Sequence, residues 1–281
     1  MTWNVIVNGE LVPESDATVH VSDLGLRRGF AAFEFFRVVG GIPLFVEDHL
    51  ARFARSCELL GLPGPSTEEI LALVTRLIAA NDLRDAGIQI VLTGGNSTDI
   101  FTPGEPNLIL APIVVNLAPD ELYETGAKVI THRNLRELPA AKTTDYLIAV
   151  QLIPRMRAEG AVEVLYHDGT RMLEGARSGL GIVTTDGVLV TVGRDVLESV
   201  TRGRMLRVAE GLMPIELRDM SLEEFAAAPE VFLTSSTRGV LPVTQVDDRI
   251  VGDGRVGPKV TRLIRAFRGH VGEYLAALTP R

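Results

Sequence analysis

Apolar positions over the first 115 residues alternate between strand spacing and helix spacing. Apolar runs broken at Asn8-Gly9 and at Gly40-Gly41 predict two β-hairpins, because these dipeptides favour tight turns. Leu50, Phe53 and Cys57 repeat at helical spacing and predict an amphipathic helix. The expected elements are strands over residues 3–7, 10–12, 30–39, 42–45, 87–93 and 107–115, and helices over 47–60 and 67–80.

A second mixed region follows a stretch over residues 116–120 that is typical of a linker. We therefore expect an α+β protein of two domains: a small N-terminal domain over residues 1–115, the linker, and a larger domain over residues 121–281. The expected elements of the larger domain are strands over 128–131, 161–166, 181–184, 188–191, 214–217 and 231–234, and helices over 144–159, from about 201, over 221–227 and over 257–276.

Composition narrows the class of protein. The chain has 281 residues, is 46% hydrophobic and 23% charged, and so can bury a sizeable core. A net charge of −8 argues against a general nucleic-acid binder. Cys57 is the only cysteine, which excludes an internal disulfide and fits a reducing compartment. The sequence contains neither a signal-peptide pattern nor an apolar run of membrane-spanning length, so we expect a cytoplasmic protein without membrane contact.

One lysine has an unusual setting. Lysine is scarce, since only Lys128, Lys142 and Lys259 occur among 28 basic residues. Small and apolar residues precede Lys142 in the stretch AAKTTDYL, and the Thr-Thr-Asp that follows predicts a helix N-cap. Burial and a helix N-terminus both lower the pKa of an amine, and Schiff-base chemistry requires such a lysine. On this stretch alone, a structural lysine beside a helix cap is the more common case.

Three further segments have polar groups that could bind a ligand. Residues 199–203 (SVTRG) begin a helix, residues 234–239 (TSSTRG) are rich in hydroxyls, and Glu174 lies beside small residues between strands. Taken singly, they are typical of a helix cap, a polar turn and a surface ion pair. Together, a lysine of lowered pKa, a carboxylate and two phosphate-suited loops are what pyridoxal 5′-phosphate (PLP) requires.

The order and spacing of six segments identify a family. The segments are RRGFAAFEFFRV, LFVEDHLARF, AAKTTDYL, LEGARSG, ESVTR and FLTSSTRGVLPV. With them, the chain resembles the class IV aminotransferases, which are PLP enzymes of fold type IV, over nearly its whole length. The resemblance implies a small N-terminal α/β domain, a larger β-barrel-like domain with helices, and a homodimer.

The resemblance also implies roles for individual residues. Lys142 would be the catalytic Schiff-base lysine and Glu174 the partner of the pyridinium nitrogen, whereas no metal is expected. Arg52 would bind the phosphate. The other implied cofactor contacts are Val200 and Thr201 at their helix N-terminus, Ser236 and Thr237, and Tyr146 facing the ring hydroxyl.

The branch of the family follows from spacing and from arginines. Tyr146 lies four residues after Lys142, which is similar to D-amino-acid transaminases and lyases, whereas branched-chain enzymes place their aromatic residue five after. Arg28 and Arg177 are candidates for binding the substrate carboxylate, because the guanidinium group can bind it in a bidentate manner. The alternative is that both pair with surface acids.

Two further positions bear on the pocket. Phe33 would form a wall of the substrate pocket, where well-known D-amino-acid enzymes have tyrosine, and Glu34 would be a structural acid. Gly179 and Leu180 stand where many relatives have asparagine and an aromatic residue.

We therefore predict a transaminase that moves the amino group of D-amino acids, such as D-alanine or D-glutamate, to 2-oxo acids such as 2-oxoglutarate. The reaction would proceed through a Lys142 Schiff base in a ping-pong cycle. Three alternatives remain open: an aminodeoxychorismate lyase that releases pyruvate and 4-aminobenzoate, a branched-chain L-amino-acid transaminase, and a non-catalytic PLP binder.

Overall fold

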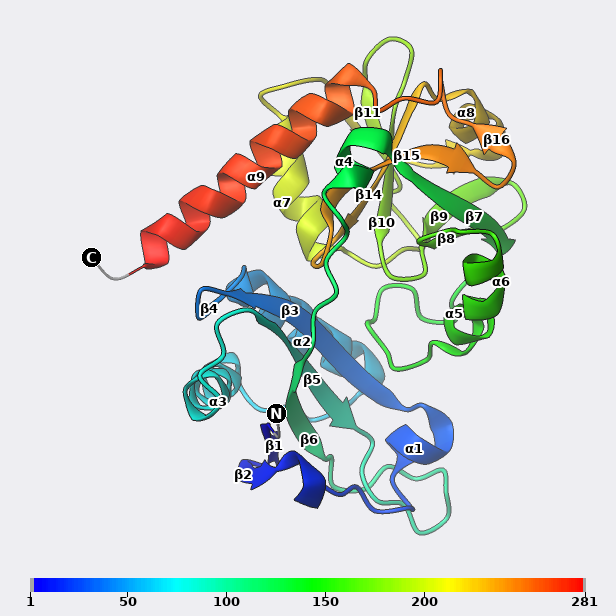
Figure 1. The fold of residues 1–281 in the computed structure, drawn as a ribbon. Coiled ribbons are helices and arrows are strands. Elements are labelled where there is room, and N and C mark those ends of the chain that lie inside the picture. The colour runs from blue at the N-terminus through cyan, green and yellow to red at the C-terminus, as the bar shows by residue number, and fades with distance from the viewer. Residues whose placement is uncertain (1–2, 280–281) are drawn as a thin grey trace. The chain divides into compact units, whose positions relative to one another are not determined.

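The computed structural model describes residues 3–279 and divides the chain into two compact units (Figure 1). The first unit comprises the described chain through Asn116, the segment Ala141–Asp145 and the described residues from Tyr274 onward. The second unit comprises Leu117–Ala140 and Tyr146–Glu273. The chain therefore returns to the first unit for five residues around Lys142.

A six-stranded antiparallel sheet forms the centre of the first unit, in the order β2-β1-β6-β5-β3-β4. The central strands β3 and β5 pair from Ala31↔Thr93 to Val38↔Ala86. Both predicted hairpins form. The strands are β1 (Asn4–Val7), β2 (Glu10–Pro13), β3 (Ala31–Val39), β4 (Ile42–Pro43), β5 (Ala86–Thr93) and β6 (Leu108–Ile113).

The two long helices of this unit begin and end at signals in their own sequence. Helix α2 (Val46–Leu60) buries Leu50, Phe53 and Cys57 as predicted, and left-handed Gly61 ends it. Helix α3 (Thr67–Ala80) begins with a capping box between Ser66 and Glu69.

The segment before β3, for which no regular element was expected, contains the short helix α1 (Leu24–Arg28). Asp23 caps this helix at Gly25 N, and its buried carboxylate also accepts hydrogen bonds from Thr93 Oγ1 (2.6 Å) and Asn107 Nδ2 (2.7 Å). This helix was not predicted because it depends on these tertiary partners of Asp23.

The second unit is built on a mixed ten-stranded sheet in which β15 is interior. Nine strands follow the order β12-β11-β10-β14-β15-β7-β8-β9-β13, and β16 pairs with β15. The strands are β7 (Ala127–Arg133), β8 (Val164–His167), β9 (Arg171–Gly175), β10 (Gly179–Val183), β11 (Leu189–Thr191), β12 (Ile215–Leu217), β13 (Met220–Ser221), β14 (Glu230–Ser235), β15 (Gly239–Val246) and β16 (Arg249–Ile250). Strands β9, β13, β15 and β16 were not among the expected elements.

Helices pack beside the strands of this sheet (Figure 1). They are α4 (Glu121–Thr125), α5 (Leu147–Gln151), α6 (Ile153–Ala158), α7 (Val200–Ala209), α8 (Leu222–Ala227) and α9 (Pro258–Leu278), the last residues of which belong to the first unit. The single helix expected over residues 144–159 was wrong. Pro154 lacks an amide hydrogen and stands in the first turn of α6, so the chain forms two short helices there.

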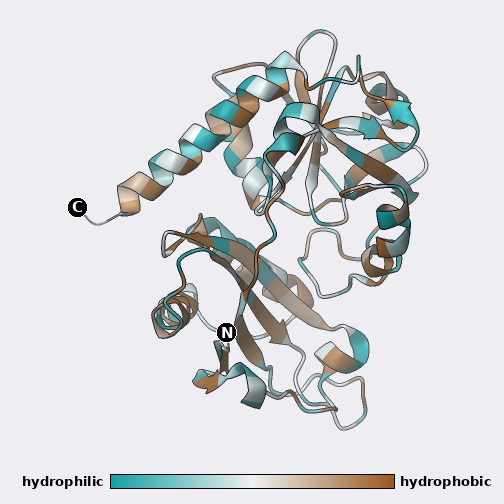
Figure 2. Ribbon diagram, viewed as in Figure 1, coloured by the Kyte–Doolittle hydropathy of each residue, from teal (hydrophilic) through white to brown (hydrophobic). Residues whose placement is uncertain are grey.

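Polar and apolar residues alternate along α9 (Figure 2), as expected for a helix with one buried face. Val260, Leu263, Ile264 and Phe267 form that face. Within residues 3–279, no helix is both long and apolar enough to cross a membrane.

Candidate active site

Lys142 lies in an extended segment that pairs with the start of β3. Its carbonyl accepts a hydrogen bond from Phe33 N (2.9 Å), and Thr144 N donates to Ala31 O (3.1 Å). Between them, Thr143 forms an antiparallel bridge with Ala32. The predicted helix N-cap after Lys142 was therefore wrong: strand-like pairing fixes these threonines, and the helix begins only at Leu147.

The side chain of Lys142 lies against an aromatic face. Its Nζ is 4.2 Å from the centroid of the Phe33 ring, within the range of a cation–π contact. The Lys142 backbone N donates to Ser56 Oγ (3.1 Å), and Ser56 is fully buried on α2. The lysine is thus anchored by its amide to a helix and by its carbonyl to a strand.

A buried charged cluster lies on the elements that anchor Lys142. Arg52 Nε donates to Glu34 Oε2 (2.8 Å) and Arg52 Nη2 to Glu34 Oε1 (2.6 Å), which is a bidentate pair. Glu34 Oε1 also accepts from Phe35 N (2.7 Å) and lies 3.1 Å from His49 Nδ1. Glu34, His49 and Arg52 are all buried, so strand β3 and helix α2 enclose a carboxylate, an imidazole and a guanidinium.

Charge and burial act on this cluster in opposite directions. Burial raises the pKa of the Glu34 carboxyl, but the positive charge of Arg52 and the hydrogen bonds from His49 and Arg52 outweigh it and hold that pKa well below its usual range. Burial lowers the pKa of His49; Glu34 opposes this, whereas Arg52 and Lys142 add to it. A carboxylate beside a neutral imidazole and a guanidinium is the expected state near pH 7.

Glu174 was expected between strands, but in the second unit it lies within strand β9. Its Oε1 accepts two hydrogen bonds from Arg136, at 2.8 Å from Nε and 2.7 Å from Nη2. Its Oε2 accepts from Leu197 N (3.0 Å). Because Glu174 is only 8% exposed, these contacts fix a nearly buried carboxylate in one orientation.

The first turn of α7 offers amide donors. Ser199 caps this helix through a hydrogen bond from Arg202 N (3.2 Å). Val200 and Thr201 are both buried, and their amides have no acceptor among the described residues. Such amides, together with the helix dipole, can bind an anion.

A tight turn over residues 236–238, which contains the candidates Ser236 and Thr237, connects β14 to β15. Thr234 Oγ1 and Ser178 Oγ are buried and have no hydrogen-bond partner in the described part of the chain. A Cβ placed on Gly179 would lie 2.7 Å from Thr234 Oγ1 and 3.6 Å from Ser199 Cβ, so these groups lie near the start of α7. Buried hydroxyls are normally hydrogen-bonded, so these two are available to hydrogen-bond a ligand or a water molecule.

The candidate Arg177 is connected to this turn through a residue that the sequence analysis missed. Arg177 Nη2 donates to Val162 O (3.3 Å), and its Nε is 3.8 Å from Glu163 Oε1, while its side chain is 54% exposed. Glu163, which is fully buried, also accepts from Arg238 Nη1 (2.9 Å). A lone acid inside the apolar run VEVLY was the available signal, because a buried carboxylate needs a partner.

Two other candidates lie at element ends. Arg28 is the last residue of α1, is exposed, and places its guanidinium 4.7 Å from the centroid of the Phe101 ring. Tyr146 is the N-cap residue of α5 without a capping side-chain bond. Arg136, which donates to Glu174, and Tyr166 were not among the candidates from the sequence. Tyr166 is buried on β8, and burial raises the pKa of its phenol to about 12, with a further increase from Glu163.

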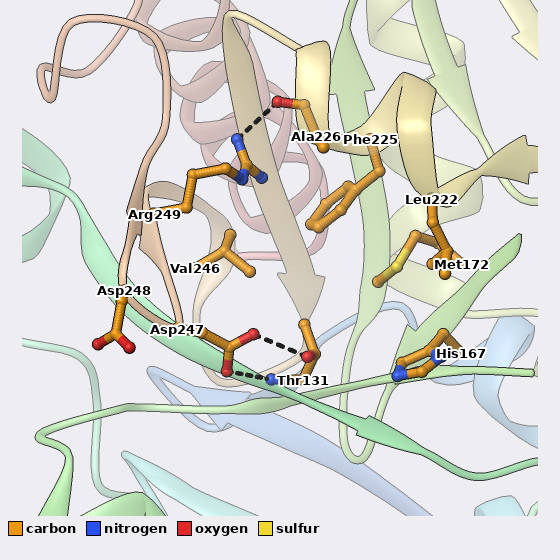
Figure 3. A pocket seen from close by; sticks show the side chains of 10 residues that line it. All are labelled: Thr131, His167, Met172, Leu222, Phe225, Ala226, Val246, Asp247, Asp248 and Arg249. Atoms are coloured by element: carbon orange, nitrogen blue, oxygen red, sulfur yellow. Dashed lines mark hydrogen bonds between the residues drawn. The ribbon is translucent and has the colours of Figure 1, made fainter. Parts of the chain in front are cut away.

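A pocket of about 370 Å³ lies in the second unit (Figure 3). Asp247 in its wall accepts hydrogen bonds from Thr131 N and Oγ1, and Arg249 donates to Ala226 O (2.7 Å). None of the candidate residues lines it.

Comparison with known proteins decides the family. The model of the family described as amino-transferase class IV matches residues 31–246. The chain belongs to the class IV aminotransferases. The D-alanine aminotransferase of Staphylococcus epidermidis is 31% identical to it over 275 residues, which cover 95% of this chain and 97% of that relative.

Relatives whose names state a different activity also match this aminotransferase over nearly its whole length. A putative branched-chain-amino-acid aminotransferase of Methanocaldococcus jannaschii is 30% identical over 279 residues, covering 94% of this chain and 95% of the relative. The crystal structure of a branched-chain amino acid aminotransferase of Escherichia coli has a TM-score of 0.87 and 27% identity, covering 96% and 94%. The predicted family and two-domain α+β fold are confirmed, whereas relatives of both substrate classes match the chain.

Proposed function

We propose that this class IV aminotransferase is a PLP-dependent enzyme that transfers the amino group of D-amino acids to 2-oxo acids. The observation that carries the proposal is the position of Lys142. Its amine lies against the Phe33 ring, and hydrogen bonds to Ser56 and Phe33 fix its backbone on both sides. A reactive amine requires such restricted, partly apolar surroundings.

Polar groups within each unit suit particular parts of the cofactor. Glu174 would accept a hydrogen bond from the ring nitrogen, since Arg136 and Leu197 N keep its carboxylate oriented. The phosphate would be bound by Arg52, the Val200 and Thr201 amides, Ser236 and Thr237, and Tyr146 would face the ring hydroxyl. The α7 amides without acceptors and the unpartnered Thr234 hydroxyl support this assignment.

When bound, PLP supplies an aldehyde that captures the amino group and a ring that withdraws electrons from the α-carbon. Lys142 Nζ then takes the proton from the substrate α-carbon and holds it for return. The Phe33 ring covers this amine and limits the access of water to it. The second 2-oxo acid reverses the steps, which gives a ping-pong cycle.

The substrate carboxylate would be bound by Arg28 and Arg177, with Phe33 as a wall of the pocket. The assignment to D-amino acids is supported by the four-residue step from Lys142 to Tyr146 and by similarity to the D-alanine aminotransferase. We also propose a homodimer, which sedimentation velocity tests directly.

A branched-chain L-amino-acid transaminase is the second candidate, favoured by the Methanocaldococcus and Escherichia relatives. The test mixes the PLP-loaded protein separately with D-alanine, D-glutamate and L-leucine and follows the cofactor absorbance in single half-reactions. We expect faster conversion with the D-amino acids. Faster conversion with L-leucine would reject D-specificity. Release of pyruvate from aminodeoxychorismate without an acceptor would establish the lyase instead, and an unchanged spectrum with every donor would establish a non-catalytic binder.

A further inference from the structure

Lys142 and Arg52 are connected by a closed chain of contacts that lies entirely within the first unit. Lys142 N donates to Ser56 Oγ (3.1 Å), and Ser56 Oγ donates to Arg52 O (3.0 Å). The Arg52 guanidinium binds Glu34 through two hydrogen bonds of 2.8 Å and 2.6 Å. Glu34 is bonded covalently to Phe33, whose N donates to Lys142 O (2.9 Å) and so closes the chain.

We propose that Glu34 and Ser56 are positioning residues that hold Arg52 and Lys142 at a fixed separation, so that a ligand with an aldehyde and a phosphate is bound at both ends at once. This inference rests on the proposed function, because it takes Lys142 as the aldehyde-binding group and Arg52 as the phosphate-binding group. It adds two residues to which the sequence analysis gave no such role.

Burial makes this closed contact chain rigid. Glu34 and Ser56 are fully buried and Arg52 is 6% exposed, so water does not compete for these hydrogen bonds. An arginine side chain otherwise has many rotamers, and fixing it before binding removes an entropic cost from the ligand. Both oxygens of Glu34 accept from the guanidinium, which sets its plane as well as its position.

The two positioning residues act on different ends of the ligand. Glu34 reaches the ligand through Arg52 and therefore affects only the phosphate. Ser56 holds the backbone of the reactive lysine and therefore affects the aldehyde end. An ordinary structural ion pair would not distinguish ligands that differ only in the phosphate.

The test compares binding of pyridoxal 5′-phosphate with that of pyridoxal, which has the aldehyde but no phosphate. For Glu34→Gln we expect the affinity for pyridoxal 5′-phosphate to fall about tenfold, the usual loss for a weakened charge-assisted contact, with unchanged affinity for pyridoxal. For Ser56→Ala we expect slower capture of both compounds. The absorbance of the lysine-bound aldehyde measures the rate of this capture.

Two matched controls separate positioning from general destabilisation. Glu230→Gln removes another buried carboxylate, which accepts from Val260 N (2.7 Å) at the start of α9. Thr75→Ala removes the same kind of hydroxyl-to-carbonyl bond, from Thr75 Oγ1 to Leu71 O (2.9 Å), on exposed α3. Both should bind the two compounds like the wild type, and melting temperatures show which variants are folded.

The outcomes are distinct. If Glu34→Gln weakens both compounds equally, or neither, and Ser56→Ala captures them at the wild-type rate, the positioning roles are wrong while the proposed function stands. If Glu34→Gln does not fold, Ser56→Ala against Thr75→Ala decides alone. If the wild type binds neither compound, the proposed function and this inference are both rejected.

Discussion

Arg136 donates two hydrogen bonds to a single oxygen of Glu174, from Nε at 2.8 Å and from Nη2 at 2.7 Å. Arg136 Nη2 also donates to Pro139 O (2.6 Å), in the segment that leads to Lys142. The guanidinium thus connects the approach to the reactive lysine with the carboxylate proposed to contact the cofactor ring nitrogen. Substitution of Arg136 should therefore change the orientation of the Glu174 carboxylate while the carboxylate itself remains.

We expect Arg136→Gln to slow the half-reaction with an amino donor about tenfold, because Glu174 loses charged donors that are individually strong. The matched control is Arg133→Gln. The exposed Arg133 side chain donates to the backbone carbonyl of Asp168 (3.0 Å) and to no other group among residues 3–279, so the rate of this variant should match the wild type. Equal rates for both variants would show that Glu174 keeps its orientation without Arg136. Stopped-flow absorbance of the cofactor provides the measurement.

The lowered pKa of His49 predicts a stability change in mild acid. An unfolded histidine binds a proton near pH 6.5, whereas burial keeps folded His49 neutral to a lower pH. Below pH 6.5 the unfolded chain therefore binds one more proton than the folded chain. As a result, the free energy of unfolding decreases as the pH is lowered. The slope approaches about 1.4 kcal/mol per pH unit until the pH reaches the folded pKa.

Replacing His49 with asparagine, which keeps a donor near Glu34, should remove this contribution. Denaturant titrations of the wild type and His49→Asn at pH 7.0, 6.0 and 5.5 give the free energy of unfolding of each. The difference between the two proteins should shift steadily in favour of the variant as the pH falls. His20, which is exposed, supplies the control His20→Asn, for which the difference should stay constant. A constant difference for His49→Asn as well would contradict a lowered pKa.

Local signals in the sequence predicted the first unit well. The bounds of α2 and α3 differ from the prediction by at most one residue, because Gly61 and the capping box at Ser66 act within a single turn. Glycine dipeptides likewise fixed the hairpin turns at Asn8-Gly9 and Gly40-Gly41. These features depend on backbone conformation and neighbouring hydrogen bonds, which a short window of sequence contains.

Features that depend on distant partners could not be predicted in this way. Strand β15 was missed because its Pro242 argues against an interior strand, yet it pairs there with Phe232 of β14. Lys142 was placed before a helix because Thr-Thr-Asp is a good capping sequence, but pairing with β3, more than a hundred residues earlier, overrides that preference. The helix face shared by His49 and Arg52 was predictable; their partner Glu34 on another element was not.

The close approach of Gly179 to Thr234 in the second unit predicts that substitutions at these two positions have coupled effects on stability. A Cβ on Gly179 would lie 2.7 Å from Thr234 Oγ1, closer than such atoms approach, whereas its next contacts are ordinary at 3.6 Å. We expect Gly179→Ala to destabilise the protein by about 1–3 kcal/mol, as overpacking does. Thr234→Ala removes the opposing oxygen, so most of this loss should disappear in the double variant.

A double-mutant cycle from urea unfolding measures this coupling. Additive losses in the double variant would mean that the added methyl group clashes elsewhere. Gly203, around which a Cβ would meet nothing within 4 Å, provides the control. Gly203→Ala lies within α7 and should stabilise the protein slightly, in line with helix propensity.

Arg177 provides the sharpest test of substrate binding. Its side chain is 54% exposed and its Nε is 3.8 Å from Glu163, so its present ion pair is weak and its guanidinium can turn toward a substrate carboxylate. We expect Arg177→Gln to raise KM for the amino-acid donor about tenfold, with a smaller effect on kcat. An amine donor without a carboxylate should react with the variant as with the wild type, because it has no carboxylate for Arg177 to bind. Arg157→Gln, an exposed arginine on α6, controls for the loss of one surface charge. An unchanged KM for the amino acid would leave Arg177 as a surface partner of Glu163 and would assign the carboxylate to another group.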